Sequence, residues 1–409
     1  MSADVTLKIV VGGDLGPVGR VQDMLVNGDT HQVFGPVAEA FEQADFAVVN
    51  LECPLANAPT PIPKPGLNFL TSVECAAAFR DSGIGALGLA NNHIMDQGWR
   101  GLESTLRACH QVGLETFGAG RNLEAADRWL IKRIGGVRVA FAAMCEREWC
   151  FGGLAFAGAA PLDPIRFTRL ISVRRKSFDY LIVLLHGGAE YHPLPSPRLQ
   201  DTCRFLVEQG ADVVVCQHSH IAGACETFRG RPIVYGQGNL LAPRSRGGQV
   251  NASWNLGFLA ELTIRHCTGK VELKRIPYVQ CRETPGIRRM LLSEAGPFAA
   301  ESDRLDALVA DPDAVLRAWV DYCTERRVFY WLSLRGNVGW RRRILRRLGL
   351  TDQFVPMTVR RALLNLLRCD AHREALEQIL ESSCGWPDPG SCADQISSNA
   401  SLHSKVPDS

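Results

Sequence analysis

The first residues, MSADVTLKIV, show no part of a secretory signal peptide. They contain no basic start, no apolar segment and no small-residue cleavage site. Long apolar runs are also missing: LIVLL at 181–185 is among the longest, and a membrane-spanning helix needs about 20 residues. These absences predict a cytoplasmic protein without a membrane span.

Three further features are missing. The 14 cysteines form no C-x-x-C pairs, which favours free thiols in a reducing compartment over a disulfide framework. The net charge is only +2, so the overall charge indicates no class of partner. GAG at 118–120 and GGL at 152–154 lack the strand–glycine–helix spacing of a dinucleotide fingerprint, so we expect no nucleotide cofactor.

Short apolar runs recur along the first two thirds of the chain, and amphipathic stretches at 99–112 and 198–209 lie between them. Continuous apolar runs are typical of strands buried on both faces, and their alternation with helices predicts a layered α/β domain. The predicted strands are 7–11, 46–50, 86–90, 138–144, 180–185, 212–216 and 232–236. A strand pair near 256–264 and 271–276 predicts an antiparallel edge.

The sequence changes character near residue 286. We predict a catalytic domain at 1–285, a basic helical extension at 286–384, with helices from about 297, and a disordered tail at 385–409, which is rich in Ser, Pro, Asp and Gly. Residues 326–368 contain eleven Arg, no Lys or Glu, and one Asp, a local net charge of +10.

Most of the predicted strands end in polar residues that could bind a ligand. Ligands in open α/β sheets bind beyond the carboxyl ends of strands, so residues distant in sequence should meet at one rim. The residues at these ends are Asp14; Asn50 and Glu52; Asn91, Asn92 and His93; His186 and Glu190; His218 and His220; and Asn239.

Carboxylate, amide and imidazole groups together suit Mn²⁺, Fe²⁺, Zn²⁺, Mg²⁺ or Ca²⁺. We predict metal ligands at Asp14, Glu52, Asn92, His186, His218 and His220. Glu52 has two oxygens and could bridge a pair of ions. Each residue also has an ordinary structural explanation, such as a turn at Asn91-Asn92 or a helix cap at Asp14, so the hypothesis depends on their joint occurrence at strand ends.

Six motifs resemble, in order and spacing, those of the CapA family, which is named for poly-γ-glutamate capsule synthesis. They are GGD, NLECPL, ANNHIMDQG, HGGAEY with Gln200 further on, CQHSH and YGQGNLL, within residues 6–245. The resemblance implies the four-layer α/β/β/α fold of metallo-dependent (calcineurin-like) phosphatases and a metal centre at the six residues above. It also implies that His93, with Asp96, corresponds to a phosphatase general acid.

The sequence departs from these patterns in several places. Phosphatases of this fold begin with D-x-H, whereas Asp14 is followed by Leu15-Gly16, so one ligand of the first metal is missing, as across the CapA group. CapA members usually read H-W-G where this chain has His186-Gly187-Gly188. Capsule-building members also usually carry an N-terminal membrane anchor, and we see none here.

Three functions remain open. The first is Cα epimerisation of the C-terminal residue of a ribosomal peptide, because anchorless CapA-like proteins resemble lasso-peptide epimerases. The second is a phosphoesterase or a role in poly-γ-glutamate synthesis, and the third is a non-catalytic binding protein. For epimerisation a cation would stabilise the developing enolate while an acid and a base act on opposite faces. The candidates are His93, His186, His220, Glu190 and Asp14, with Asp96 behind His93.

The arginine-rich region suggests what the partner carries. Arg pairs bidentately with carboxylates, so residues 326–368 favour an acidic peptide, such as a precursor or leader peptide. We expect neither nucleic acid nor a membrane as a partner, and the sequence does not indicate an oligomeric state.

Overall fold

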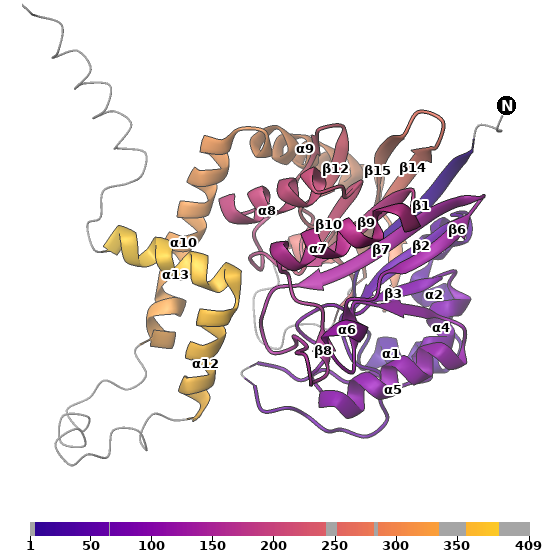
Figure 1. Cartoon of the computed structure of the whole chain (residues 1–409), viewed down its shortest axis with the longest axis horizontal. Helices are drawn as coiled ribbons and strands as arrows, with labels where there is room; N and C mark the ends of the chain where they lie inside the picture. Colours follow the sequence, from indigo (N-terminus) through magenta and orange to yellow (C-terminus); the bar gives the residue numbers. More distant parts are fainter. Residues whose placement is uncertain (1–4, 65, 243–251, 282–284, 335–356, 384–409) are drawn as a thin grey trace, which may run out of the picture.

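The computed structural model describes residues 5–64, 66–242, 252–281, 285–334 and 357–383. In these ranges two β-sheets pack face to face and helices cover both outer faces (Figure 1). A single hydrophobic cluster between the sheets joins residues of both, including Val48 and Phe141. The predicted four-layer α/β/β/α architecture is therefore confirmed.

The larger sheet has eight strands. Its strands in order are β16 (Ile287–Arg289), β15 (Lys270–Gln280), β14 (Leu256–Arg265), β1 (Thr6–Leu15), β2 (Phe46–Leu51), β3 (Ala86–Gly88) and β4 (Glu115–Phe117), with β13 (Asn239–Leu241) beside the end of β1. The predicted antiparallel hairpin exists as β14 and β15, but β16 lies outside it and forms the edge. The sheet thus continues a few residues past the predicted domain boundary at 285.

The second sheet has six strands, four of them parallel neighbours. In order they are β11 (Cys225–Phe228), β12 (Arg231–Val234), β10 (Val213–Gln217), β9 (Tyr180–His186), β7 (Val137–Cys145) and β6 (Leu130–Ile134), and β5 (Ala119–Gly120) pairs separately with β8 (Gly158–Ala159). Every residue of β9 and β10 is buried, as their apolar sequences predicted. Parallel strands bring their carboxyl ends to one rim.

Helices cover the outer faces of the two sheets. Phe41, Phe79 and Leu102 pack on the larger sheet, while Phe167 and Leu206 pack on the second. The helices are α1 (Arg20–Val26), α2 (Thr30–Phe34), α3 (Pro36–Glu42), α4 (Cys75–Asp81), α5 (Gly98–Gln111), α6 (Leu123–Ala126), α7 (Pro164–Arg174) and α8 (Pro197–Glu208). The two predicted helices correspond to α5 and α8, each within two residues at both ends.

Helices follow the last strand, beginning at Leu292 and thus earlier than expected. They are α9 (Leu292–Val309), α10 (Pro312–Leu334), α12 (Met357–Arg368) and α13 (Asp370–Ser383). The last three share a small hydrophobic cluster around Trp319, and α10 packs against α8 (Figure 1). We call α10, α12 and α13 the helical wall. None of the described helices is long and apolar enough to cross a membrane.

Two predictions fall outside the described residues. These are the central part of the arginine-rich region, residues 335–356, and the predicted tail at 385–409. The division into three domains stays a prediction.

Candidate metal centre

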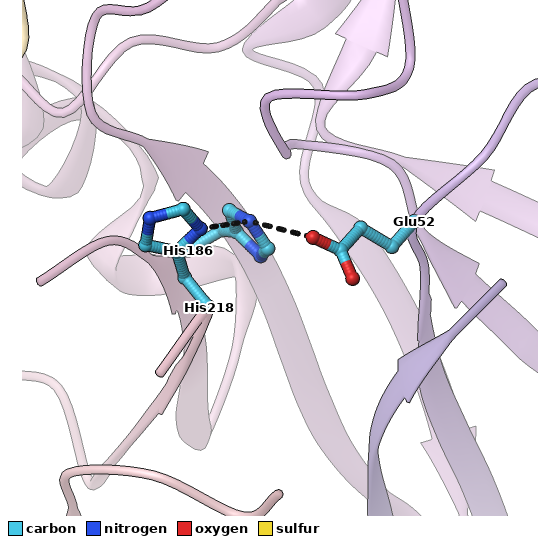
Figure 2. Close-up of side chains that lie close together, drawn as sticks. All are labelled: Glu52, His186 and His218. Atoms are coloured by element: carbon cyan, nitrogen blue, oxygen red, sulfur yellow. Dashed lines mark hydrogen bonds and ion pairs between the residues drawn. The ribbon is translucent and has the colours of Figure 1, made fainter. Parts of the chain in front are cut away.

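The six predicted ligands meet at the rim where the strands of both sheets end. Asp14 belongs to the end of β1, Glu52 follows β2, Asn92 follows β3, His186 ends β9, and His218 and His220 follow β10. Figure 2 shows the carboxylate of Glu52, from one sheet, pointing at the imidazoles of His186 and His218, from the other. The site is therefore a junction between the two sheets.

His186 lies in the middle of this group. Its Nε2 atom lies 3.1 Å from Oδ1 of Asn92, 3.1 Å from Nδ1 of His218 and 3.4 Å from Oε1 of Glu52. Its Nδ1 atom lies 3.2 Å from Nδ2 of Asn50, an amide that also donates to Asp14. Asn50 thereby orients both the imidazole and the carboxylate.

Two sets of ligand atoms could each hold an ion, and Glu52 belongs to both. One set is Glu52, His186 and His218, and the other is Asp14, Glu52 and His220. Within each set the ligand atoms lie within 4.8 Å of one another. A shared carboxylate between two such sets is the arrangement expected of a bridging ligand.

The unsatisfied groups at the centre also fit a cation. Oε1 of Glu52 is buried and has no hydrogen-bond partner. Burial, and then the charge of Asp14, raise the pKa of Glu52 well above its usual value. Burial, and then His218 and His220, lower the pKa of His186 well below its usual value. A divalent ion would favour both the carboxylate and the neutral imidazole, which are the forms that bind metals.

The backbone after β10 is held in an unusual conformation. His218 and His220 both have positive φ, 91° and 59°, which costs free energy for residues other than glycine. The amide of His218 donates to Oδ2 of Asp14 at 3.1 Å, which helps to hold this turn. Strain of this kind concentrates at functional sites.

His93 follows β3 and is not part of either ligand set. Its Nδ1 atom lies 2.7 Å from Oδ2 of Asp96, which is fully buried and forms an ion pair with Lys64. Burial lowers the pKa of His93, although Asp96 opposes this effect. The imidazole therefore tends to be neutral, and its Nε2 atom is left without the proton.

His220 belongs to the set with Asp14 and Glu52 and contacts Asn239 of β13. Its Nδ1 atom is 2.9 Å from Oδ1 of Asn239, and the amide of Asn239 donates back to the carbonyl oxygen of His220 at 3.1 Å. The ring also packs beside Trp254, with ring centroids 5.0 Å apart. These contacts fix the ring and leave its Nε2 atom for a ligand or a proton.

Two carboxylates at this rim escaped the sequence analysis. Glu146 and Glu148 directly follow β7, and Oε2 of Glu148 accepts a hydrogen bond from Asn92 at 3.2 Å. Glu146 also explains the H-G-G sequence, because a Cβ at Gly187 would lie 2.6 Å from its Cγ atom. Burial raises the pKa of Glu148, but His218, His372 and Asn92 lower it more, so its net pKa is lowered.

The centre opens into a cleft of about 500 Å³. Glu190, a predicted catalytic residue, lines this cleft but is exposed and belongs to neither ligand set. The other walls are largely aromatic, and they come partly from the helical wall. The cleft residues include Glu52, Lys64, Leu67, Phe69, Asn92, His93, Glu148, Trp149, Tyr191, His218, His220, Trp254, Tyr322, Arg326, Tyr330 and His372.

Solved structures with some likeness to this chain include two enzymes of nucleotide or phosphoester chemistry. Calcineurin-like phosphoesterase YfkN from Bacillus subtilis is 11% identical, with a TM-score of 0.38, covering 66% of this chain and 89% of that one. NAD nucleotidase (NadN) from Haemophilus influenzae is 12% identical, with a TM-score of 0.38, covering 77% and 60%. At such scores nothing about activity follows.

Curated relatives match the part of the chain that contains most of the two sheets. The capsule biosynthesis protein CapA of Bacillus anthracis is 27% identical over 245 residues, which span 58% of this chain and 59% of that protein. The PGA biosynthesis protein CapA of Bacillus subtilis is 27% identical over 247 residues, which span 58% and 64%. The match therefore covers less than two thirds of either relative.

The family model "Bacterial capsule synthesis protein PGA_cap" matches residues 8–244, the segment that carries all six predicted ligands. The chain belongs to this CapA-type capsule synthesis protein family.

Proposed function

We propose that this protein is a metal-dependent enzyme that epimerises the α-carbon of a residue in a peptide substrate. One observation carries the proposal: His93 follows β3, whereas His220 contacts residues of β1 and β13, on the other side of β2 in the sheet, and each has its Nδ1 atom held by an oxygen of a neighbouring side chain. Inversion at carbon needs a base on one face and an acid on the other. Hydrolysis of a phosphate ester needs no such pair.

The sheet order supports the opposite placement. His220 contacts Asp14 and Asn239, which belong to β1 and β13. His93 follows β3, which lies on the far side of β2 from β1. Glu52, the shared ligand, follows the intervening β2. A substrate above Glu52 would thus have an imidazole on each side.

The protein groups have distinct roles in this reaction. Nε2 of His93 removes the α-proton, because Asp96 holds the proton on Nδ1 and burial keeps the ring neutral. Asp96 is fully buried, and its ion pair with Lys64 offsets its negative charge. His220 carries the proton that is delivered to the opposite face. A bound divalent ion supplies positive charge beside the substrate carbonyl, where negative charge develops.

The cleft walls favour a peptide over a polyanion. Among the described residues that line the cleft, Glu52, Glu148 and Glu190 are acidic and Lys64 and Arg326 are basic, and Lys64 is already paired with Asp96. The aromatic rings provide apolar surface for a side chain of a peptide residue. Poly-γ-glutamate would bring a negative charge at every residue.

The second candidate is phosphoester hydrolysis or a step in poly-γ-glutamate synthesis. The family membership and the names of the relatives favour it. The absence of a histidine two residues after Asp14 weakens the hydrolase alternative, because phosphatases of this fold use a ligand there. We therefore expect no robust hydrolysis of an aryl phosphate that depends on Asp14.

The deciding experiment is hydrogen exchange at carbon. The metal-loaded protein is incubated in D₂O with synthetic peptides of varied C-terminal residue, followed by mass spectrometry and chiral amino-acid analysis. We expect one deuterium per inverted residue, with loss of this exchange in His93→Gln and retention in His110→Gln, a matched change at an exposed position of α5. Aryl phosphate hydrolysis or glutamate-polymer turnover without α-exchange would overturn the proposal.

The role of His220 needs a separate measurement, since it could instead bind a second ion. We expect His220→Gln to keep the ion held by Glu52, His186 and His218 while blocking inversion. Metal analysis of this variant distinguishes the two uses. Loss of a full equivalent of metal on this substitution would assign His220 as a ligand and leave the second proton-transfer group elsewhere.

A further inference from the structure

A second cluster of metal-binding side chains lies between the catalytic layers and the helical wall. Its members are Glu148, which follows β7, Cys369, between α12 and α13, and His372 on α13. Their ligand atoms all lie within 4.8 Å of one another. Sγ of Cys369 is 3.7 Å from Oε1 of Glu148, although 221 positions separate the two residues in sequence.

Of the two carboxylates beside Cys369, one is paired with an arginine and the other, within the described ranges, is not. Its thiol contacts two carboxylates, Glu146 at 3.6 Å and Glu148 at 3.7 Å. Glu146 is paired with Arg198 and also accepts the amide of Ala371 at 3.2 Å. Among the described residues, no Lys or Arg forms an ion pair with Glu148, whose ion-pair neighbour is His218 at 3.9 Å. Glu148 is 9% exposed, so its charge is largely shielded from water.

His372 is oriented as metal-binding histidines commonly are. Its Nδ1 atom lies 3.0 Å from the hydroxyl of Tyr330, a residue of α10. An outer partner of this kind fixes the ring and is typical of histidines that bind an ion through the other nitrogen. Glu148 and His372 both line the cleft, so an ion between them would keep one side open to it.

We propose that Glu148, Cys369 and His372 form a binding site for a borderline divalent cation of the Zn²⁺ class. Thiolate, imidazole and carboxylate together are a zinc-type set, and three protein ligands leave a fourth position for water or substrate. On binding, the thiol proton of Cys369 passes to solvent and the sulfur takes the bond to the ion. The ion fastens the helical wall to the catalytic layers across the cleft.

This site has a signature that the rim centre lacks, because neither ligand set of that centre contains a thiol. The full-length protein is stripped of metal and titrated with Co²⁺, and the near-ultraviolet band of thiolate-to-cobalt charge transfer is followed. We expect the band in the wild type and its loss in Cys369→Ser. It should persist in Cys323→Ser, a matched change at another buried cysteine of the helical wall.

Two further measurements keep the test decisive if Cys369→Ser folds poorly. X-ray absorption of zinc-loaded Glu52→Gln, which should lack metal at the rim centre, should show one sulfur neighbour at about 2.3 Å. His372→Gln should weaken zinc binding at this site by at least about 10-fold. An absent band with only nitrogen and oxygen neighbours, or a band unchanged in Cys369→Ser, would overturn the site.

The proposal does not depend on the epimerase assignment. Glu52→Gln removes the shared ligand of the rim centre but none of the three ligands here. We expect that variant to keep the cobalt–thiolate band while losing activity. The two proposals are therefore tested by separate measurements. α-Proton exchange tests the epimerase, and the cobalt–thiolate band tests the site at Cys369.

Discussion

The two sides of the cleft are held in different ways. On the strand rim, Asp14 pairs in register with Asn50 on one side and with Asn239 on the other, so backbone hydrogen bonds fix the site. The helical wall is attached through side chains, with Glu374 accepting hydrogen bonds from Ser196 at 2.6 Å and from Arg198 at 3.0 Å. A ladder of backbone bonds is harder to displace than a few polar contacts.

This difference suggests a division of labour. In the proposed reaction the rim holds the groups that react with the substrate, and these must keep their geometry to within fractions of an ångström. The wall contributes Tyr322, Arg326 and Tyr330 to the cleft, where they would contact the substrate. Substitutions at the rim should therefore abolish chemistry, while substitutions in the wall should change substrate affinity or local stability.

The largest effect should come from Glu52→Gln at the rim. Because Glu52 belongs to both ligand sets, we expect loss of metal at the centre and a fall in kcat of about 10²–10³-fold or more. Metal analysis and the peptide exchange assay measure these effects. Glu103→Gln, at an exposed position of α5, is the control and should change neither.

Glu52→Gln should abolish activity but raise the stability of the metal-free protein relative to the wild type. The pKa of Glu52 is raised in the folded state, first by burial and then by Asp14. The contribution of Glu52 to stability is present below its pKa in the unfolded chain. It is lost as the pH rises through its higher pKa in the folded protein. The metal-free wild type should therefore lose Tm relative to Glu52→Gln as pH increases from 5 to about 8. A constant Tm difference across this range would contradict the assignment.

The second effect is expected from Arg326→Gln in the wall. The guanidinium lies over the rings of Tyr191 and Tyr322, 5.5 Å from each centroid, and lines the cleft. If it binds a carboxylate of the peptide, its loss should raise KM about 10-fold, equivalent to about 1.4 kcal/mol, with kcat little changed. Arg327→Gln, at an exposed neighbouring position, is the control. Equal effects of both variants would indicate general charge attraction.

How far the sequence could predict this cleft also differs between its two sides. Strands buried on both faces have continuous apolar sequences, so their ends, and with them Asp14, Glu52 and His186, were visible. The same rule applied to the run at 138–144 leads to Glu146 and Glu148, which were overlooked.

The rule that ligands follow apolar strands does not apply to the helical wall. Cys369 and His372 meet Glu148 only because α12 and α13 pack against the catalytic layers, and no sequence period links positions so far apart. Glu190 lines the cleft but belongs to neither ligand set, so its catalytic role stays a prediction. It lies four residues beyond the end of β9, where the strand no longer fixes the direction of the side chain.

The third effect concerns the attachment of the wall itself. Glu374→Gln keeps the shape of the side chain but removes the charge that Arg198 and Ser196 bind. We expect a loss of about 1–3 kcal/mol in the local stability of α13. Hydrogen exchange should speed up in α13 and stay unchanged in β9 and β10. Glu377→Gln on the same helix is the control, since that side chain is 64% exposed.

The smallest effect should come from Glu294→Gln, where the sheet passes into the helices. Arg288 donates to both oxygens of Glu294, at 2.6 and 2.7 Å, and the amide of Leu291 donates at 2.8 Å. Hydrogen bonding to Arg288, and then to Leu291, lowers the pKa of Glu294 to about 2. The contribution of Glu294 to stability is thus present above its pKa in the unfolded chain, about 4.3, and is lost as the pH falls towards 2.

Because this pair is exposed to solvent, the change in Tm at pH 7 should be no more than about 2 °C. Thermal unfolding of the wild type and Glu294→Gln should converge as pH falls from about 5 to 3. Arg288→Gln should produce a similar loss, and the double variant should lose little more than either single one, because both changes break the same interaction. Additive losses would show that the two residues stabilise the junction independently. Unchanged exchange in α13 in all three variants would confine the effect to the start of α9, apart from the helical wall.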